Sequence, residues 1–256
     1  MSEKTYKSND IIITENGVRL IAVVKANAYG HGAPEVARIL YQQGVDFFAV
    51  SYLKEALALR HSGLRGSILL LTPLITEDQV QEALENHITL SITSLPEAEL
   101  IDKVSRLSKR IATVHLKVDT GLGRFGMDLE QALQCCEALN RNSNIYIEGI
   151  YTHMAEGAAR NTRYTLNQFK RFREVINQLQ DRGYHIPICH CANSAVLLNY
   201  PHMQLDAVRV GTLLSGQHPV GKISHRLELR DPYRFKCRII SVRNLKKGSY
   251  LGYNRT

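Results

Sequence analysis

Hydrophobic and polar positions follow one pattern along most of the chain: a short apolar run, then a longer stretch with apolar residues three and four positions apart. Short apolar runs predict buried strands, and the helical period predicts amphipathic helices. Eight runs fit the strand pattern, at residues 20–24, 46–50, 67–71, 88–92, 111–118, 145–151, 185–190 and 205–210. The stretches with helical period lie at residues 33–44, 51–63, 76–87, 94–108, 127–140 and 162–183.

Eight strands that alternate with helices predict an α/β fold of the (β/α)8 barrel type, with parallel strands. No clear helix follows the eighth run. The stretch before the first run is too short and too rich in β-branched residues to predict a helix. From about residue 224 the pattern changes to alternating, β-prone sequence. We therefore expect a barrel over residues 1–223 and the start of a C-terminal β domain over residues 224–256.

Composition narrows the class of protein. The chain has 256 residues, 44% of them hydrophobic, which is enough for one large domain or one with a small appendage. No apolar run approaches the roughly 20 residues that span a bilayer, and the first 20 residues lack a signal-peptide pattern. Five cysteines without C-x-x-C spacing indicate neither a disulfide framework nor a zinc site. We expect a cytoplasmic location, reduced thiols, no metal and no membrane partner.

The net charge of +8 is spread along the whole chain, and no basic run is interleaved with aromatic residues. This distribution argues against nucleic acid as a partner. A mild excess of positive charge also suits an enzyme that handles carboxylates or phosphates, because the positive field attracts such anions.

Residues that can carry chemistry gather at the ends of five predicted strands. In barrels of this type the active site lies where the strands end, so the five ends predict one site. The residues are Lys25 after the first strand; Lys117, Asp119 and Arg124 after the fifth; His153 after the sixth; His190, Asn193 and Ser194 after the seventh; and Arg209, Gly211 and Thr212 after the eighth.

Several of these residues, and Tyr29 close after Lys25, also have a plainer interpretation. Burial of Lys25 would lower its pKa and leave a nucleophilic amine suited to a Schiff base, but the side chain could equally extend to solvent. Tyr29 and the glycines beside it can approach an anion or form an ordinary turn. Ser194 can bind phosphate or cap a helix. His153 can act as a ligand, a base or a packing partner, and His190 gives a weaker signal.

Five motifs in the same order resemble the pyridoxal-phosphate domain of alanine racemases. They are "AVVKANAYGHG", "HLKVDTGLGRFG", "GIYTHMA", "HCANSA" and "VRVG", and the resemblance runs from about Ile21 to Thr256. It implies that Lys25 forms a Schiff base with the cofactor aldehyde and that His153 packs against the pyridine ring. It assigns the phosphate to Tyr29, Ser194, Gly211 and Thr212, with Asn193 beside them in the cofactor site.

The resemblance also implies roles in catalysis. Arg209 faces the pyridine nitrogen with His190 supporting it, and this disfavours protonation of the ring and should suppress transamination. Arg124 reaches the substrate carboxylate, and Lys117 corresponds to a lysine that can be carbamylated and that orients this arginine. Lys25 is then placed to move the proton on Cα of the amino acid, since the cofactor delocalises the negative charge that is left.

Two departures leave alternatives open. The region before Ile21 is shorter than in the family, which leaves open whether barrel closure depends on a neighbour. The family continues beyond Thr256 through a β domain that supplies a tyrosine, the second base, to the partner in a homodimer. We therefore expect an amino-acid racemase, for alanine above all, that forms a homodimer. Its activity is expected to be impaired for lack of the second base unless a separate chain supplies the β domain. The alternatives are a non-catalytic pyridoxal-phosphate-binding protein and an enzyme acting on another amino acid.

Overall fold

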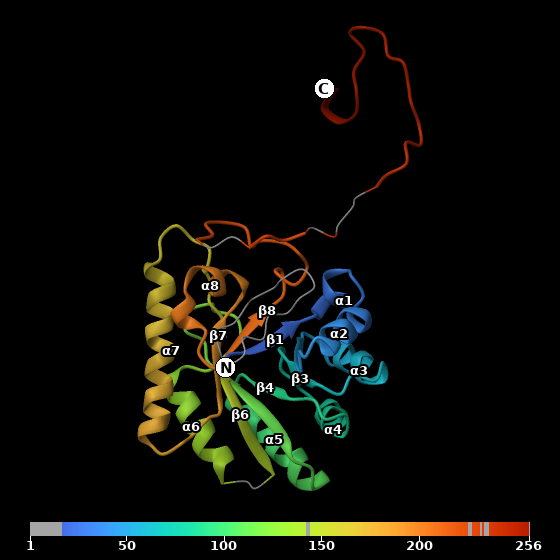
Figure 1. Cartoon of the computed structure of the whole chain (residues 1–256). Coiled ribbons are helices and arrows are strands. Elements are labelled where there is room, and N and C mark those ends of the chain that lie inside the picture. Colours follow the sequence, from blue (N-terminus) through green and yellow to red (C-terminus); the bar gives the residue numbers. More distant parts are fainter. Residues whose placement is uncertain (1–16, 142–143, 225–226, 231, 233–235, 256) are drawn as a thin grey trace.

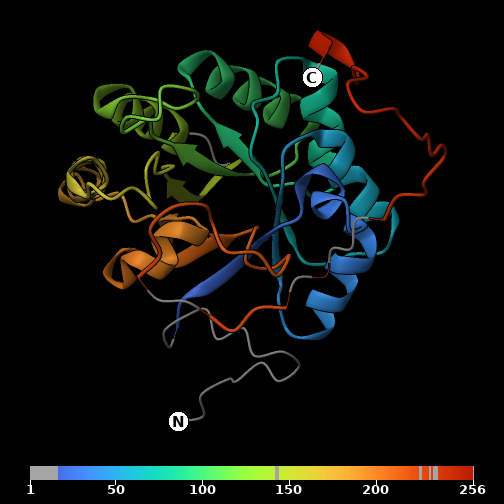
Figure 2. The same cartoon turned by 90° about the horizontal axis from the view of Figure 1, so that it is seen from above.

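The protein, seen here as a computed structural model, is described for residues 17–141, 144–224, 227–230, 232 and 236–255. Parallel strands form a ring with helices packed around its outside (Figure 1, Figure 2). The strands are β1 (Arg19–Val23), β2 (Phe47–Val50), β3 (Ser67–Leu70), β4 (Leu90–Ile92), β5 (Ala112–Lys117), β6 (Ile145–Tyr151), β7 (Ile188–Ala192) and β8 (Ala207–Val210). The predicted (β/α)8 barrel is confirmed.

The ring of strands closes within the described part of this chain. The hydrogen-bonded order is β3-β2-β1-β8-β7-β6-β5-β4, so β1 lies between β2 and β8. The gap between β3 and β4 is bridged by Leu69 and Thr89, because Thr89 N donates to Ile68 O and Leu70 N to Thr89 O, each at 2.9 Å. The sheet therefore closes without a neighbouring chain.

The outer layer consists mainly of the helices that the sequence predicts. Local signals set their starts: Thr76 Oγ1 accepts from Gln79 N at 3.3 Å, and Asp128 Oδ1 accepts from Gln131 N at 2.8 Å. Two short helices, α1 and α8, carry site residues. The helices are α1 (Lys25–Tyr29), α2 (Ala33–Gln42), α3 (Leu53–His61), α4 (Glu77–Glu85), α5 (Leu95–Ser108), α6 (Leu129–Asn140), α7 (Arg163–Asp181) and α8 (Ser194–Asn199).

Two apolar cores explain why the strands read as continuous apolar runs. Successive side chains of a strand point to opposite faces, so Phe47 lies inside the barrel with Ile21 and Leu69, while Phe48 packs against the helices. Both phenylalanines are fully buried. A strand buried on both faces needs apolar residues at every position, and this requirement produces the pattern in the sequence.

The seventh strand lies later than predicted. The sequence predicts it at residues 185–190, whereas β7 covers Ile188–Ala192. Pro187 has no N–H to donate to a neighbouring strand, and pairing begins directly after it. As a result His190 lies inside the strand and is fully buried, and does not follow the strand end.

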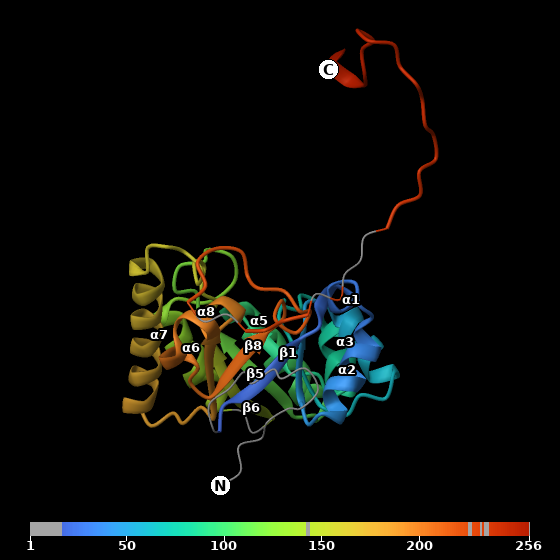
Figure 3. The same cartoon turned by 45° about the horizontal axis from the view of Figure 1, so that its top comes forward.

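The described residues after 223 contain no strand. Leu227 and Leu229 pack on the barrel core, and residues 236–255 are exposed and lead away from the barrel (Figure 1, Figure 3). A β domain starting near residue 224 stays a prediction. The stretch before the first strand lies outside the described residues as far as residue 16. No helix in the described ranges combines the length and apolar character needed to cross a bilayer.

Candidate functional site

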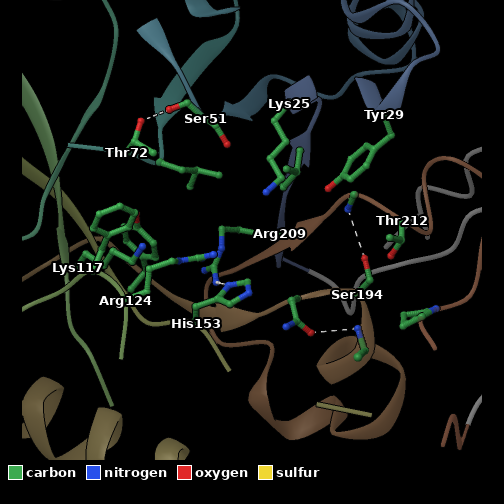
Figure 4. A pocket seen from close by; sticks show the side chains of 18 of the residues that line it. Lys25, Tyr29, Ser51, Thr72, Lys117, Arg124, His153, Ser194, Arg209 and Thr212 are labelled. Atoms are coloured by element: carbon green, nitrogen blue, oxygen red, sulfur yellow. Dashed lines mark hydrogen bonds between the residues drawn. The ribbon is translucent and has the colours of Figure 1, made fainter. Parts of the chain in front are cut away.

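A cavity of about 610 Å³ opens where the strands end. Of the twelve candidate residues named from the sequence, ten line it, and side chains from several strand ends point into it (Figure 4). The ten are Lys25, Tyr29, Lys117, Arg124, His153, Asn193, Ser194, Arg209, Gly211 and Thr212. The other two are outside the lining: His190 lies beneath the cavity and contacts Arg209, and Asp119 holds a loop beside it.

Lys25 and Tyr29 are placed by an unusual turn, α1, directly after β1. Ala26, Asn27, Ala28 and Tyr29 all have positive φ values between 52° and 56°, so the turn is left-handed. Such a conformation costs an L-residue roughly 1–2 kcal/mol, so the surrounding contacts must hold it. The turn presents Lys25 at its start and Tyr29 at its end, and both side chains face the cavity (Figure 4).

The carboxylate of Glu55, on α3, fixes this turn. Its Oε1 accepts a hydrogen bond from Ala26 N at 2.6 Å, directly after the lysine. Its Oε2 accepts from Ser51 N at 2.8 Å and from Tyr52 N at 3.0 Å. Glu55 thus joins the lysine-bearing turn to the loop after β2, whose Ser51 also lines the cavity.

One end of the cavity is made of uncharged donors. Gly211 N donates to Ser194 Oγ at 3.3 Å, and the Tyr29 hydroxyl lies so close to Gly211 that a Cβ at this position would overlap it. Burial raises the pKa of Tyr29, so its hydroxyl stays protonated and can donate. Asn193 Oδ1 accepts from Ala195 N at 3.1 Å and so begins α8. This cluster of hydroxyl and N–H groups suits a phosphate.

The other end is cationic, and Arg209 lies at its base. This guanidinium is buried and donates to His190 Nδ1 and to Thr152 O, each at 2.7 Å. His153 Nδ1 lies 3.3 Å from Arg209 Nη2. Since arginine can only donate, His153 accepts at Nδ1. Burial and the charge of Arg209 lower the pKa of His153 to about 3, so its ring is neutral and can pack against a flat ligand.

Lys117 is the second cation at this end. Its Nζ lies 5.2 Å from the centre of the Phe125 ring and 5.4 Å from that of Tyr151. Burial, with the charges of Arg209 and Arg124, lowers the pKa of Lys117 to about 8. About a tenth of this amine is therefore neutral and nucleophilic at pH 7, far more than for an ordinary lysine.

Arg124 stands on the loop after β5, and Asp119 shapes that loop. The Asp119 carboxylate accepts hydrogen bonds from the backbone N–H groups of residues 121, 122 and 123, each at 2.8 Å. Gly126 closes the loop at a φ of 131°, where a Cβ would lie 2.6 Å from Asp119 N. Asp119 therefore holds the loop from outside the cavity, and Arg124 reaches in.

The charges that line the cavity have one sign. Lys25, Lys117, Arg124 and Arg209 are basic, and no carboxylate is among the described lining residues. Such a site favours a ligand with several negative charges. Within the described ranges no group of three or more His, Cys, Asp or Glu side chains could hold a metal ion.

Comparison with known proteins agrees with this geometry. The family model "Alanine racemase, N-terminal domain" matches residues 9–219. The chain belongs to this family. An alanine racemase from Desulforamulus reducens is 40% identical over 239 residues, which are 93% of this chain and 64% of that protein. One from Clostridium tetani is 36% identical over 259 residues, covering 100% of this chain and 66% of that protein. The chain thus spans about two thirds of the length of these relatives.

Solved alanine racemases share the fold. One from Clostridium difficile, in complex with cycloserine, superposes with a TM-score of 0.82 at 33% identity, over 86% of this chain and 60% of that one. One from E. faecalis superposes with a TM-score of 0.83 at 30% identity, over 95% of this chain and 65% of that one.

Several further residues line or support the cavity, and the sequence analysis did not predict them. Ser51 and Thr72 line the cavity, and the Thr72 hydroxyl donates to Ser51 O. Tyr151 also lines it, at the last position of β6, and a tyrosine at a buried strand end could have been noticed. Glu55 has no such signal, because a glutamate in the first turn of an amphipathic helix normally faces solvent.

Proposed function

We propose that this chain forms the cofactor-binding barrel of a pyridoxal-phosphate-dependent alanine racemase, an isomerase that interconverts L- and D-alanine by moving the proton on Cα. One observation above all supports this proposal: an amine, a cluster of uncharged phosphate donors and a buried guanidinium all face one cavity. The membership of the racemase family agrees with it.

The residues present fit the cofactor. The volume of about 610 Å³ is typical of a small-molecule site. Tyr29, Ser194 and Thr212, with the N–H of Gly211, would hold the phosphate, and the absence of a side chain at Gly211 leaves the Tyr29 hydroxyl in place. Asn193 would keep Ser194 in position by beginning α8, and Lys25 lies within the same cavity to bond the aldehyde carbon.

When bound, the cofactor supplies an electron sink that makes Cα–H of an amino acid acidic. Lys25 then takes the proton from one face and returns it, acting as acid and base. Arg209 would donate a hydrogen bond toward the ring nitrogen but does not release its proton, because an arginine guanidinium stays protonated in proteins. A weak sink of this kind favours return of the proton to Cα over transamination.

Arg124 would bind the substrate carboxylate from the rim of the cavity. Lys117 is placed for carbamylation, in which its neutral amine adds to CO2 to give a carbamate and release one proton. The pKa of about 8 keeps enough amine neutral for this addition. Carbamylation would turn a cation beside Arg124 and Arg209 into an anion, which would remove the repulsion and orient Arg124.

Racemisation needs a second proton carrier on the opposite face of Cα. From the family resemblance we expect this carrier in the β domain of a partner subunit, and we propose that the working enzyme is a homodimer, with a separate chain carrying the β domain as the alternative. The cytoplasmic location is likewise our inference from the sequence.

The first test is binding of the cofactor. Adding pyridoxal phosphate to the protein should produce the absorption band of a Schiff base, shifted from that of the free aldehyde. Lys25→Ala should abolish this band, because Lys25 is the amine that we assign to the aldehyde, whereas Lys117, the second amine lining the cavity, lies at its cationic end between Phe125 and Tyr151. Lys170→Ala on the exposed face of α7 is the matched control and should keep the band. A band that survives in Lys25→Ala would refute the central assignment.

The second test follows both enantiomers of alanine in heavy water by proton NMR, reading Cα–H exchange and enantiomer composition together. Exchange with inversion supports the racemase. Exchange with retention on one enantiomer shows Lys25 working alone on one face. A bound cofactor without exchange on either enantiomer would refute alanine racemisation by this chain and favour a binding protein or another substrate.

A further inference from the structure

We propose that Glu148, in the middle of β6, is a positioning residue for Arg209. It acts through two buried histidines by fixing which ring nitrogens carry protons. Its bearing on catalysis rests on the proposed function, whereas the hydrogen-bond chain stands on the structure of the protein without ligand.

Four side chains form a continuous chain beneath the cavity. Arg209 Nη1 lies 2.7 Å from His190 Nδ1. His190 Nε2 lies 2.9 Å from His115 Nδ1. His115 Nε2 lies 3.0 Å from Glu148 Oε2. Each is a hydrogen-bond distance, so the guanidinium at the base of the cavity is joined to a carboxylate through two imidazoles.

The chemistry of the two ends sets the direction of every bond. Arg209 has only donors, so His190 accepts at Nδ1 and, when neutral, carries its proton on Nε2. That proton is donated to His115 Nδ1, which leaves the His115 proton on Nε2. Only an acceptor can complete such a chain, and the Glu148 carboxylate is an acceptor. Both histidines are therefore held as the Nε2–H tautomer.

The neutral state of both rings follows from their surroundings. Burial is the largest cause that lowers the pKa of His190 and of His115, and the charge of Arg209 lowers both further. Glu148 opposes this for His115 through its hydrogen bond and its charge. The rings are also packed: Tyr151 stacks on His190 with centroids 4.9 Å apart, and Phe47 meets His115 edge-on at 5.8 Å.

The backbone is shaped to bring Glu148 to His115. Val114 pairs with Ile147 but His115 pairs with Gly149, so Glu148 is the extra residue of a β-bulge. Bulges redirect side chains and often lie beside active sites. Gly149 leaves room for the imidazole, because a Cβ there would lie 2.5 Å from His115 Nδ1. A second register shift lies between His190 and Ala192.

The buried charge of Arg209 explains why the hydrogen-bond chain to Glu148 is needed. Arg209 is fully enclosed, yet no ion pair with a carboxylate is found for it in the described parts of the molecule. Glu148, with its side chain 17% exposed, is the only acid in the hydrogen-bond chain. It orders the histidines so that His190 offers a lone pair, and not a proton, to Arg209. The guanidinium is thereby held toward the cavity.

The test uses the cofactor-free protein with ¹⁵N-labelled histidine. Long-range ¹H–¹⁵N spectra distinguish the tautomers, and we expect Nε2–H for both His115 and His190. Glu148→Gln should keep this pattern, because its amide oxygen can accept. Glu148→Lys presents a donor to His115 and should move the His115 proton to Nδ1. Nδ1–H on either ring of the wild type would overturn the proposal without any variant.

Glu137→Lys is the matched control, since it makes the same charge change on the exposed face of α6, where Glu137 pairs with Arg141. It should leave both tautomers unchanged. If circular dichroism shows that Glu148→Lys does not fold, the spectra of the wild type and of Glu148→Gln still test which ring nitrogens carry the protons. Unchanged tautomers in folded Glu148→Lys would also refute the proposal.

With pyridoxal phosphate bound, Glu148→Lys should raise the ratio of transamination to Cα proton exchange by about tenfold, the lower end of effects seen for residues behind a ligand-contacting group. Glu148→Gln should leave that ratio close to wild type. A merely structural role of Glu148 would lower both reactions together in Glu148→Lys and leave their ratio unchanged. Failure of the wild type to bind the cofactor would refute the proposed function and leave the tautomer result standing.

Discussion

The two ends of the cavity are built by opposite means. At the end formed by Tyr29, Ser194 and Gly211, the groups are neutral hydroxyls and backbone N–H groups, and they are held by turns and by lack of a side chain at one glycine. At the end formed by Arg209 and Lys117, the groups are buried cations, held by carbonyls, imidazoles and aromatic faces.

The two ends of the cavity therefore depend on different physical factors. Neutral donors that are hydrogen-bonded cost far less to bury than charges do, so the phosphate end depends mainly on shape. Buried cations are expensive and need partners for every donor, so the cationic end depends on electrostatics and on residues that lie behind it. Carboxylates serve both ends from outside the cavity, Glu55 by binding backbone N–H groups and Glu148 through two histidines.

We expect the largest effect, a loss of stability, from removing the buried cation at the cationic end. Arg209→Met should lower the free energy of unfolding of the cofactor-free protein by about 3 kcal/mol, because Thr152 O and His190 Nδ1 lose their donor. Arg171→Met is the control: Arg171 donates to Thr120 O from an exposed position and should cost less than about 1 kcal/mol. Thermal or urea unfolding measures both, and equal losses would contradict the comparison.

A smaller effect should come from crowding the phosphate end. In Gly211→Ala the new methyl group displaces the Tyr29 ring, and such overpacking costs about 1–3 kcal/mol, which is about fivefold to 150-fold weaker binding of pyridoxal phosphate. Titration followed by absorbance measures it. Tyr200→Phe, at a buried tyrosine just after α8, should bind the cofactor normally. Unchanged affinity in Gly211→Ala would show that shape does not govern this end.

The smallest effect should come from Glu55→Gln, which keeps the size of the clamp on the lysine-bearing turn. The amide has one acceptor where the carboxylate serves three N–H groups, so we expect a loss of about 1 kcal/mol, or about fivefold in cofactor affinity. Asp128→Asn weakens a similar cap on α6 and should alter only thermal stability. The prediction fails if both variants bind the cofactor equally well.

The sequence predicted the barrel because strands buried on both faces leave apolar runs that few other folds produce. It also predicted most of the cavity, since residues after strand ends converge on one rim, and ten of them do so. It placed β7 early because "HIPI" is apolar, although Pro187 delays pairing. It missed the His115–Glu148 contact, because a bulge shifts register without changing the apolar pattern.

The bulge at Glu148 sets a limit on how this site could be transplanted. Barrel enzymes usually keep chemistry on their rim loops and leave stability to the strands, so loops can be exchanged between scaffolds. Here the guanidinium under the cavity depends on residues in the middle of β5, β6 and β7, and Gly149 has to remain without a side chain. A designer who grafted only the rim onto another barrel would copy Arg209 without the groups that orient it.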